Sequence, residues 1–292
     1  MRKQNKPLVS IVIPTFNRSK FVQKAIDSSL SQTYPCEVIV CDHGSSDDTP
    51  KVMKKYGKKI NYIRREKDFG PHFCWLEGIL NATGEYVHLQ FDDDWIDKTY
   101  IANCMKFMKK DVGVVIADAY GIFHFKKIFK KSGIFPKLKI EKRLLKGTMY
   151  SPGASLFRKK DLIDALYQGN LPLSKYSSYH GVGPDSFMTL LAVLRYKKVG
   201  IVTEHLVFFR EHEGSITCNA HKDPERYKKL RNAYENVISY YMFLKWFWFF
   251  NKLKYFNFYF WIRESKRIGR IFLKKLGLFE DAKVFLKKIK LI

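Results

Sequence analysis

Three consecutive carboxylates, Asp92, Asp93 and Asp94, follow an apolar segment and precede Trp95. Like charges held this close repel one another, and a bound cation would neutralise them. Mg²⁺ and Mn²⁺ favour such oxygen ligands and usually complete their coordination shells with water and substrate phosphates. The run therefore indicates a divalent metal site that serves a phosphate-bearing substrate. The structural alternative is that the carboxylates only cap and charge a helix expected over residues 98–110.

An alternation of apolar strands and helices must position this run. Residues 8–13 form a continuous apolar segment that stops at Pro14, and residues 38–41 form a second one. Both are typical of strands buried on two faces. Helical spacing of apolar residues follows each of them, and a strand over residues 85–90 leads into the carboxylates. This alternation predicts an α/β fold with a mostly parallel, Rossmann-like sheet flanked by helices.

Polar side chains follow three of the expected strands. Thr15, Asp42 and Asp93 each stand at or just beyond a strand's carboxyl end. In open parallel sheets, ligands bind beyond the carboxyl ends of the strands. We therefore expect these three side chains to contribute to one binding site.

Five motifs in this order resemble those of family 2 glycosyltransferases, which have the GT-A fold. They are Pro14-Thr15-Phe16-Asn17-Arg18, Asp42-His43-Gly44-Ser45, the acidic run, Gly183-Pro184-Asp185 and Arg210-Glu211-His212. Each motif is short, but their order and spacing together are specific. The resemblance covers roughly residues 7–220.

The resemblance implies inverting transfer of a sugar from a nucleotide-diphosphate sugar, a UDP-sugar first of all, to an acceptor hydroxyl. Asp185 would be the catalytic base. Mn²⁺ or Mg²⁺ would be held by Asp93, Asp94 and His212 and would stabilise the leaving diphosphate. The residues that would bind the nucleotide sugar are Pro14, Thr15, Asn17, Asp42, Asp92 and Arg210.

The chain departs from the family pattern at four places. His43 stands where the family has a second Asp, and Phe91 stands where the metal motif has its first Asp. Trp75 and Leu76 replace an Arg-Asn pair on the third helix, and Pro184 replaces a Glu. These departures bear on donor specificity more than on activity. They also keep open the alternative of a catalytically inactive, glycosyltransferase-like scaffold.

The formal charge of +25 is concentrated outside these motifs. Residues 121–147 carry nine Lys and Arg against one acidic residue, and residues 222–292 carry eighteen against six, which gives +8 and +12. We interpret residues 121–150 as a basic insertion near the acceptor side of a catalytic domain over residues 1–220. Residues 221–292 would form a basic, aromatic, helical extension.

The extension interleaves aromatic and basic residues. Its apolar stretch over residues 237–250 is interrupted by Lys245 and is shorter than the ~20 residues that a spanning helix needs. This pattern favours helices that lie on an anionic membrane surface. The alternative is that they pack on the catalytic domain or on a second copy in a homodimer. Basic-aromatic sequence also suits nucleic acid, but no nucleic-acid-binding motif accompanies it, and we expect no such partner.

The five cysteines are odd in number and lack metal-ligand spacing, which predicts reduced, mostly buried thiols in the cytosol. The amino end lacks the apolar core of a signal peptide. We therefore expect a cytoplasmic protein at the inner face of a bacterial membrane. Its acceptor would be a glycan or lipid-linked glycan, such as lipo-oligosaccharide, capsule or a teichoic-type polymer.

Overall fold

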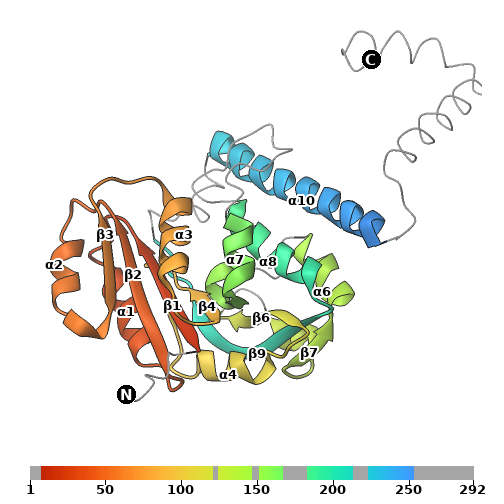
Figure 1. Cartoon of the computed structure of the whole chain (residues 1–292), viewed down its shortest axis with the longest axis horizontal. Coiled ribbons are helices and arrows are strands. Elements are labelled where there is room, and N and C mark those ends of the chain that lie inside the picture. Colours follow the sequence, from red (N-terminus) through yellow and green to blue (C-terminus); the bar gives the residue numbers. More distant parts are fainter. Residues whose placement is uncertain (1–7, 121–123, 147–150, 167–182, 213–222, 253–292) are drawn as a thin grey trace, which may run out of the picture. The chain divides into compact units, whose positions relative to one another are not determined.

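The computed structural model describes residues 8–120, 124–146, 151–166, 183–212 and 223–252 (Figure 1). The chain forms two compact units, Met1–Tyr241 and Met242–Ile292. The expected domain boundary near residue 220 lies outside the described residues, as does most of the second unit.

One sheet organises the first unit. Its order is β3-β2-β1-β4-β8-β6-β9-β5, and β7 pairs with β9 as a side branch. The strands are β1 (Val9–Thr15), β2 (Cys36–His43), β3 (Asn61–Arg65), β4 (Tyr86–Leu89), β5 (Trp95–Ile96), β6 (Val112–Ala119), β7 (Gly133–Pro136), β8 (Ser155–Arg158) and β9 (Lys198–Phe208).

Helices connect and cover these strands. Helix α3 packs on β1 and β2, whereas α4 packs on β6 and β9. In Figure 1, α3 and α7 lie on one side of the sheet and α4 lies on the other. The helices are α1 (Val22–Leu30), α2 (Thr49–Lys54), η1 (Gly57–Lys59), α3 (Pro71–Asn81), α4 (Tyr100–Phe107), α5 (Phe125–Ile128), α6 (Lys137–Leu144), η2 (Pro152–Ala154), α7 (Lys159–Leu166), α8 (Pro184–Arg195) and α10 (Pro224–Lys252).

The predicted α/β class is confirmed, and the strand directions divide the sheet. Strands β1 to β4 pair in parallel, as do β6 and β9. Strand β8 runs antiparallel to both β4 and β6, and β5 and β7 run antiparallel to β9. The first half is therefore the expected parallel sheet, and the second half is mixed.

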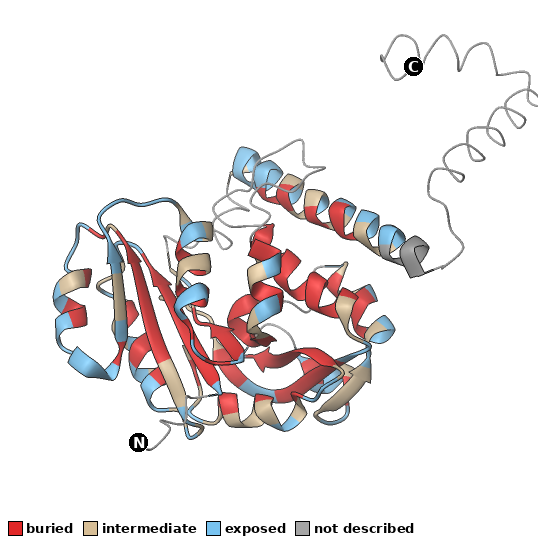
Figure 2. Cartoon of the chain, viewed as in Figure 1, coloured by how far each residue is buried: buried red, intermediate tan, exposed pale blue. Residues whose placement is uncertain are grey.

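The central strands are buried on both faces, which explains their continuous apolar sequence. All seven residues of β1 are buried (Figure 2). In the parallel register of β1 and β2, Pro14 lies opposite Cys41 and Thr15 lies opposite Asp42. The two strands therefore end level with each other, and their following loops start side by side.

Candidate functional site

The acidic run forms a tight loop between β4 and β5 that is tied to the segment after β9. Within the loop, the Asp94 amide donates to the carbonyl of Phe91 at 3.2 Å. Asp94 is buried, and its Oδ1 accepts the backbone N–H of Arg210 at 2.9 Å. The Arg210 guanidinium donates through Nε to the backbone carbonyl of Asp93 at 3.0 Å. Two hydrogen bonds thus join segments that are far apart in the sequence.

Aromatic rings hold the basic side chains of this site. His212 Nε2 lies 3.0 Å from Asp93 Oδ2, and the imidazole packs against Phe21 with ring centroids 4.9 Å apart. The Arg210 guanidinium lies 5.1 Å from the Phe21 ring and 5.3 Å from the Trp95 ring. Cation–π attraction therefore positions Arg210 between two aromatic side chains. Phe21 was not predicted as a site residue, because its apolar spacing indicated only the buried face of a helix.

The charges of the acidic loop destabilise one another. Burial and the neighbouring charge of Asp93 raise the pKa of Asp92 to about 7, although the Thr15 side chain and the Arg18 charge oppose this rise. Burial and Asp93 also raise the pKa of Asp94. A divalent cation would offset both effects by favouring the charged carboxylates. Asp93, Asp94 and His212 offer oxygen and imidazole ligands of the kinds that bind Mn²⁺ or Mg²⁺. Among the described residues, however, their ligand atoms do not form one three-residue cluster, and Asp94 Oδ1 is occupied by the Arg210 amide.

Asp42 is fixed at the end of β2 by three neighbours. Its Oδ1 accepts the backbone N–H of Ser45 at 2.9 Å, and its Oδ2 accepts the hydroxyl of Tyr62 at 2.7 Å. The Nε of Arg64 lies 3.6 Å from Oδ2. A carboxylate has about four lone-pair directions, so these neighbours leave at least one of them unused, although the Asp42 side chain is fully buried. Tyr62 was not anticipated, since it lies on a separate strand.

Asn17 fastens the loop after β1 to the loop after β2. Its Oδ1 accepts the backbone N–H groups of Ser46 at 2.8 Å and Asp47 at 3.3 Å. Its own N–H donates to the Ser45 hydroxyl at 2.9 Å, with φ at +54°. Asn is among the residues that adopt this left-handed conformation most readily. Thr15 is buried beside this junction.

Two residues that depart from the family pattern, Trp75 and Phe91, pack against each other. The Trp75 and Phe91 rings have centroids 5.8 Å apart at 48°, and Trp75 is 6% exposed. Gly153 of η2 leaves space for the Phe91 ring, because a Cβ there would lie 3.2 Å from Phe91 and 3.3 Å from Phe209. An apolar contact thus stands where the family pattern has an Arg-Asn pair and an Asp.

Asp185 is the second residue of α8, after Pro184 and the turn at Gly183, whose φ is +105°. Its Oδ1 accepts the N–H groups of Gly183 at 2.8 Å and Ser186 at 2.6 Å. Burial raises the pKa of Asp185 to about 6. Helix α8 packs on η2, and Gly153 of η2 lies near Phe91. A short series of contacts therefore connects the helix of Asp185 to the acidic loop.

The amino-terminal part of α10 packs within the first unit. A Cβ on Gly183 would lie 3.3 Å from the Val237 side chain, so α10 closes over the turn before Asp185. The Tyr241 hydroxyl donates to Glu141 of α6 at 2.7 Å. Beyond Tyr241, several large apolar side chains of α10 are exposed, namely Met242, Phe243, Trp246 and Phe247. None of the described helices is both long and apolar enough to cross a membrane.

Residues 10–166 match the profile of the family described as Glycosyl transferase family 2. This chain belongs to that family. The predicted family is therefore confirmed, and the match covers the strands and loops that carry Thr15, Asp42 and the acidic run.

Individual relatives are distant or partial matches. Glycosyltransferase GlyA of Streptococcus pneumoniae is 23% identical over 72% of this chain and 31% of its own length. An uncharacterized glycosyltransferase of Rickettsia typhi is 43% identical over 32% of this chain and 30% of its own length. The chain thus spans about a third of the length of these curated relatives.

Solved structures share the fold. Staphylococcus aureus TarS 1-349 in complex with UDP-GlcNAc aligns with a TM-score of 0.59 and 21% identity, over 79% of this chain and 66% of that one. A second similar structure is glucosyl-3-phosphoglycerate synthase of Mycobacterium tuberculosis in complex with Mn²⁺, UDP and phosphoglyceric acid. It aligns with a TM-score of 0.53 and 15% identity, over 80% of this chain and 78% of that chain. The predicted GT-A fold agrees with both.

A double-mutant cycle tests the coupling of Trp75 and Phe91. Trp75→Ala and Phe91→Ala should each lower the free energy of unfolding, because Trp75 is buried and Phe91 is half-buried against it. The double variant should lose about 0.5–1.5 kcal/mol less than the sum of the single losses, since the ring pair can be lost only once. Urea unfolding of the four proteins measures this. Strict additivity would mean that the contact contributes no pairwise stabilisation.

Proposed function

We propose that the chain is an inverting glycosyltransferase that moves a sugar from a nucleotide-diphosphate sugar to an acceptor hydroxyl. The observation that carries this proposal is the tethering of the acidic loop to Arg210 and His212, in a chain of this family. The tether gathers carboxylates, an imidazole and a guanidinium into one place. Such a set suits a substrate whose leaving group is a diphosphate.

The donor would lie across the carboxyl ends of β1 and β2. Pro14, Thr15 and Asn17 would line the nucleotide pocket, and Asp42 would accept a hydrogen bond from the base. Asp92, beside Thr15, would face the donor. A UDP-sugar is favoured because the similar TarS structure contains UDP-GlcNAc. Arg210, held between two rings, would oppose the charge that develops on the diphosphate.

Mn²⁺ or Mg²⁺ would be held by Asp93, Asp94 and His212. When bound, the ion supplies positive charge that stabilises the departing nucleoside diphosphate. The similar mannosyltransferase PcManGT from Pyrobaculum calidifontis is described in complex with GDP-Man and Mn²⁺, which supports a divalent ion.

Asp185 would act as the general base. Its carboxylate would take the proton of the acceptor hydroxyl as that oxygen bonds to the anomeric carbon and the bond to the diphosphate breaks. A single displacement of this kind inverts the anomeric configuration. The hydrogen bonds from Gly183 and Ser186 orient one carboxylate oxygen, Oδ1.

The acceptor is proposed to be a glycan or lipid-linked glycan of the bacterial cell envelope. The chain would work in the cytoplasm at the inner face of the membrane, with α10 and the basic residues beyond it on the anionic surface. Exposed Phe243, Trp246 and Phe247 on α10 support this arrangement. Each Lys or Arg near such a surface would contribute on the order of 1 kcal/mol.

Replacing one carboxylate tests the donor site. Asp93→Asn should lower sugar transfer or donor hydrolysis by at least about 100-fold, because the negative charge that would bind the ion is lost while an acceptor for His212 is kept. Excess chelator should abolish turnover by the unaltered protein. The matched control is Asp48→Asn, since that carboxylate is 68% exposed on the loop before α2. Full turnover in chelator would refute metal assistance, and no turnover with any nucleotide sugar in a broad panel would favour the inactive scaffold.

The pH dependence of turnover tests the base. A base must be deprotonated, and the pKa of Asp185 is raised to about 6. Turnover at low substrate should therefore fall about tenfold per pH unit below 6 and level off above it. Asp185→Asn should lower turnover about 100-fold or more and remove this acidic limb, while donor affinity stays nearly unchanged. If turnover of Asp185→Asn still falls below pH 6 in the same way, a group other than Asp185 causes this pH dependence.

Vesicle sedimentation tests the membrane surface. The full chain should sediment with anionic vesicles and be partly released by salt, because screening weakens charge attraction but not insertion of aromatic side chains. Changing Phe243, Trp246 and Phe247 together to Ser should weaken binding at high salt. Leu80→Ser is the control, since Leu80 is 54% exposed on α3. Equal binding to neutral and anionic vesicles, or none to either, would favour packing on the protein or a homodimer instead.

A further inference from the structure

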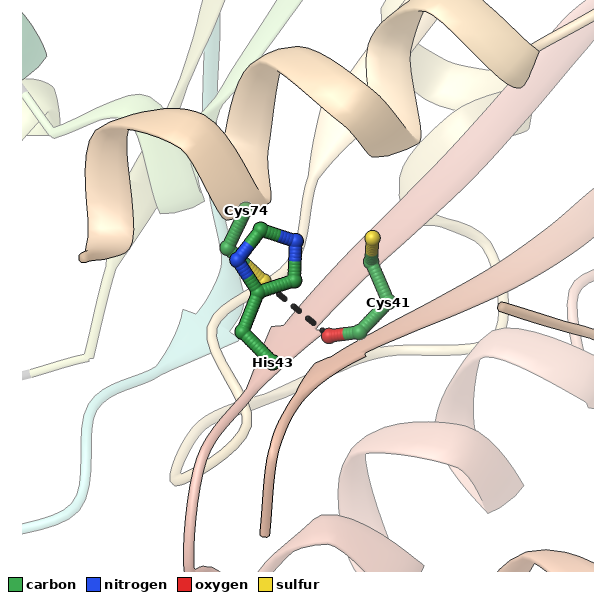
Figure 3. A group of neighbouring side chains, drawn as sticks. All are labelled: Cys41, His43 and Cys74. Carbon is green, nitrogen blue, oxygen red and sulfur yellow. Dashed lines mark hydrogen bonds between the residues drawn. The ribbon is translucent and has the colours of Figure 1, made fainter. Parts of the chain in front are cut away.

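Three metal-ligating side chains meet in the layer between β2 and α3. Cys41 and His43 are two residues apart on β2, so they lie on the same face of that strand. Cys74 approaches from α3, which packs on β2 (Figure 3). One ligand atom from each of the three residues lies within 4.8 Å of the other two, and all three residues are buried.

The imidazole of His43 has one ring nitrogen paired and one unpaired. Its Nε2 lies 2.9 Å from Glu77 Oε2. Its Nδ1 is buried and has no hydrogen-bond partner in the described part of the chain, and the residue is 1% exposed. Leaving a buried polar atom without a partner costs on the order of 1–3 kcal/mol. A ligand for this nitrogen would remove that cost.

Glu77 lies against the other ring nitrogen of His43 and is paired with Arg65. Arg65 donates through Nε to Glu77 Oε2 at 2.7 Å, so the carboxylate lies beside a guanidinium. A carboxylate can only accept a hydrogen bond, so this contact favours the tautomer in which His43 Nε2 donates its N–H to Glu77 and Nδ1 keeps its lone pair. Carboxylates commonly orient metal-bound histidines in this way.

We propose that Cys41, His43 and Cys74 bind one Zn²⁺ ion through two thiolates and the His43 imidazole. Sulfur and imidazole ligands favour Zn²⁺ over Mg²⁺ or Mn²⁺, so this site would differ in metal from the acidic loop. Two thiols release their protons to solvent when the ion binds, and the two negative charges balance those of Zn²⁺. The complex is thus neutral overall, as burial requires.

The geometry needs only a small adjustment. With Zn–S bonds of about 2.3 Å and tetrahedral angles, two sulfurs lie roughly 3.8 Å apart. The ligand atoms lie within 4.8 Å of one another, so the contraction that a bound ion would need is at most roughly 1 Å. The Cys74 thiol, which now donates to the Cys41 carbonyl at 3.1 Å, would give up that bond on deprotonation.

The site would join the strand of Asp42 to the helix of Trp75. Asp42 precedes His43 on β2, and Trp75 follows Cys74 on α3, so the ion would hold both elements from the interior. This also accounts for His43, where the family pattern has an Asp. The inference goes beyond the proposed glycosyl transfer and does not depend on it.

Zinc content of the full chain tests the site. Untagged protein, purified with reductant and dialysed, should contain close to one Zn²⁺ per chain by elemental analysis. The Cys41→Ala/Cys74→Ala variant should retain less than about a tenth of this, as expected when two of three ligands are lost. Cys104→Ala is the matched control, because Cys104 is equally buried on α4. Asp93→Asn should also keep its zinc, which separates this site from the acidic loop.

Cobalt titration of the unaltered protein gives a readout that does not depend on the folding of a variant, because bound Co²⁺ should show thiolate charge-transfer bands. In a second titration, Glu77→Ala should weaken the affinity of the protein for Co²⁺ by about 10–100-fold. Chelator should lower the melting temperature of the unaltered protein but not of the double-cysteine variant. The proposal is overturned if the unaltered protein binds neither Zn²⁺ nor Co²⁺ through thiolates, if the double variant keeps its zinc, or if Cys41 and Cys74 form a disulfide in the reduced preparation.

Discussion

Repulsion among three adjacent carboxylates is the constraint on which the site depends. The protein holds Asp92 to Asp94 together by burying Asp94 against the Arg210 amide and by placing His212 beside Asp93. Phe21 and Trp95 then fix the guanidinium of Arg210 without neutralising it. The loop after β9 must therefore meet the loop after β4, and the mixed half of the sheet brings them together.

Trp75 and Phe91 are aromatic where the family pattern has polar residues, and they form a second group of contacts behind the acidic loop. Trp75 packs against Phe91, Phe91 lies close to Gly153, and α8 packs on the same turn. A series of contacts thus connects the acidic loop to the helix of Asp185. Because interiors are close-packed, a change of side-chain volume at Phe91 should disturb its neighbours.

Alternate side chains of β2 point to opposite faces of the sheet. Asp42 turns toward Tyr62 and the loop of Ser45, whereas Cys41 and His43 turn toward α3. This alternation follows from the two-residue period of a strand. It separates the carboxylate proposed for base recognition from a thiol and imidazole cluster, although the residues are adjacent in sequence.

The sequence alone determined the α/β class, the family and the order of the motifs, because buried strands and βα loops leave local patterns that reading along the chain detects. It could not show that β8 runs antiparallel, since a strand of four residues carries no mark of direction. Nor could it show that Trp75 meets Phe91, that Tyr62 holds Asp42, or that Cys74 joins Cys41 and His43. Each of these contacts pairs separate elements, so only the packing of helices on the sheet decides it.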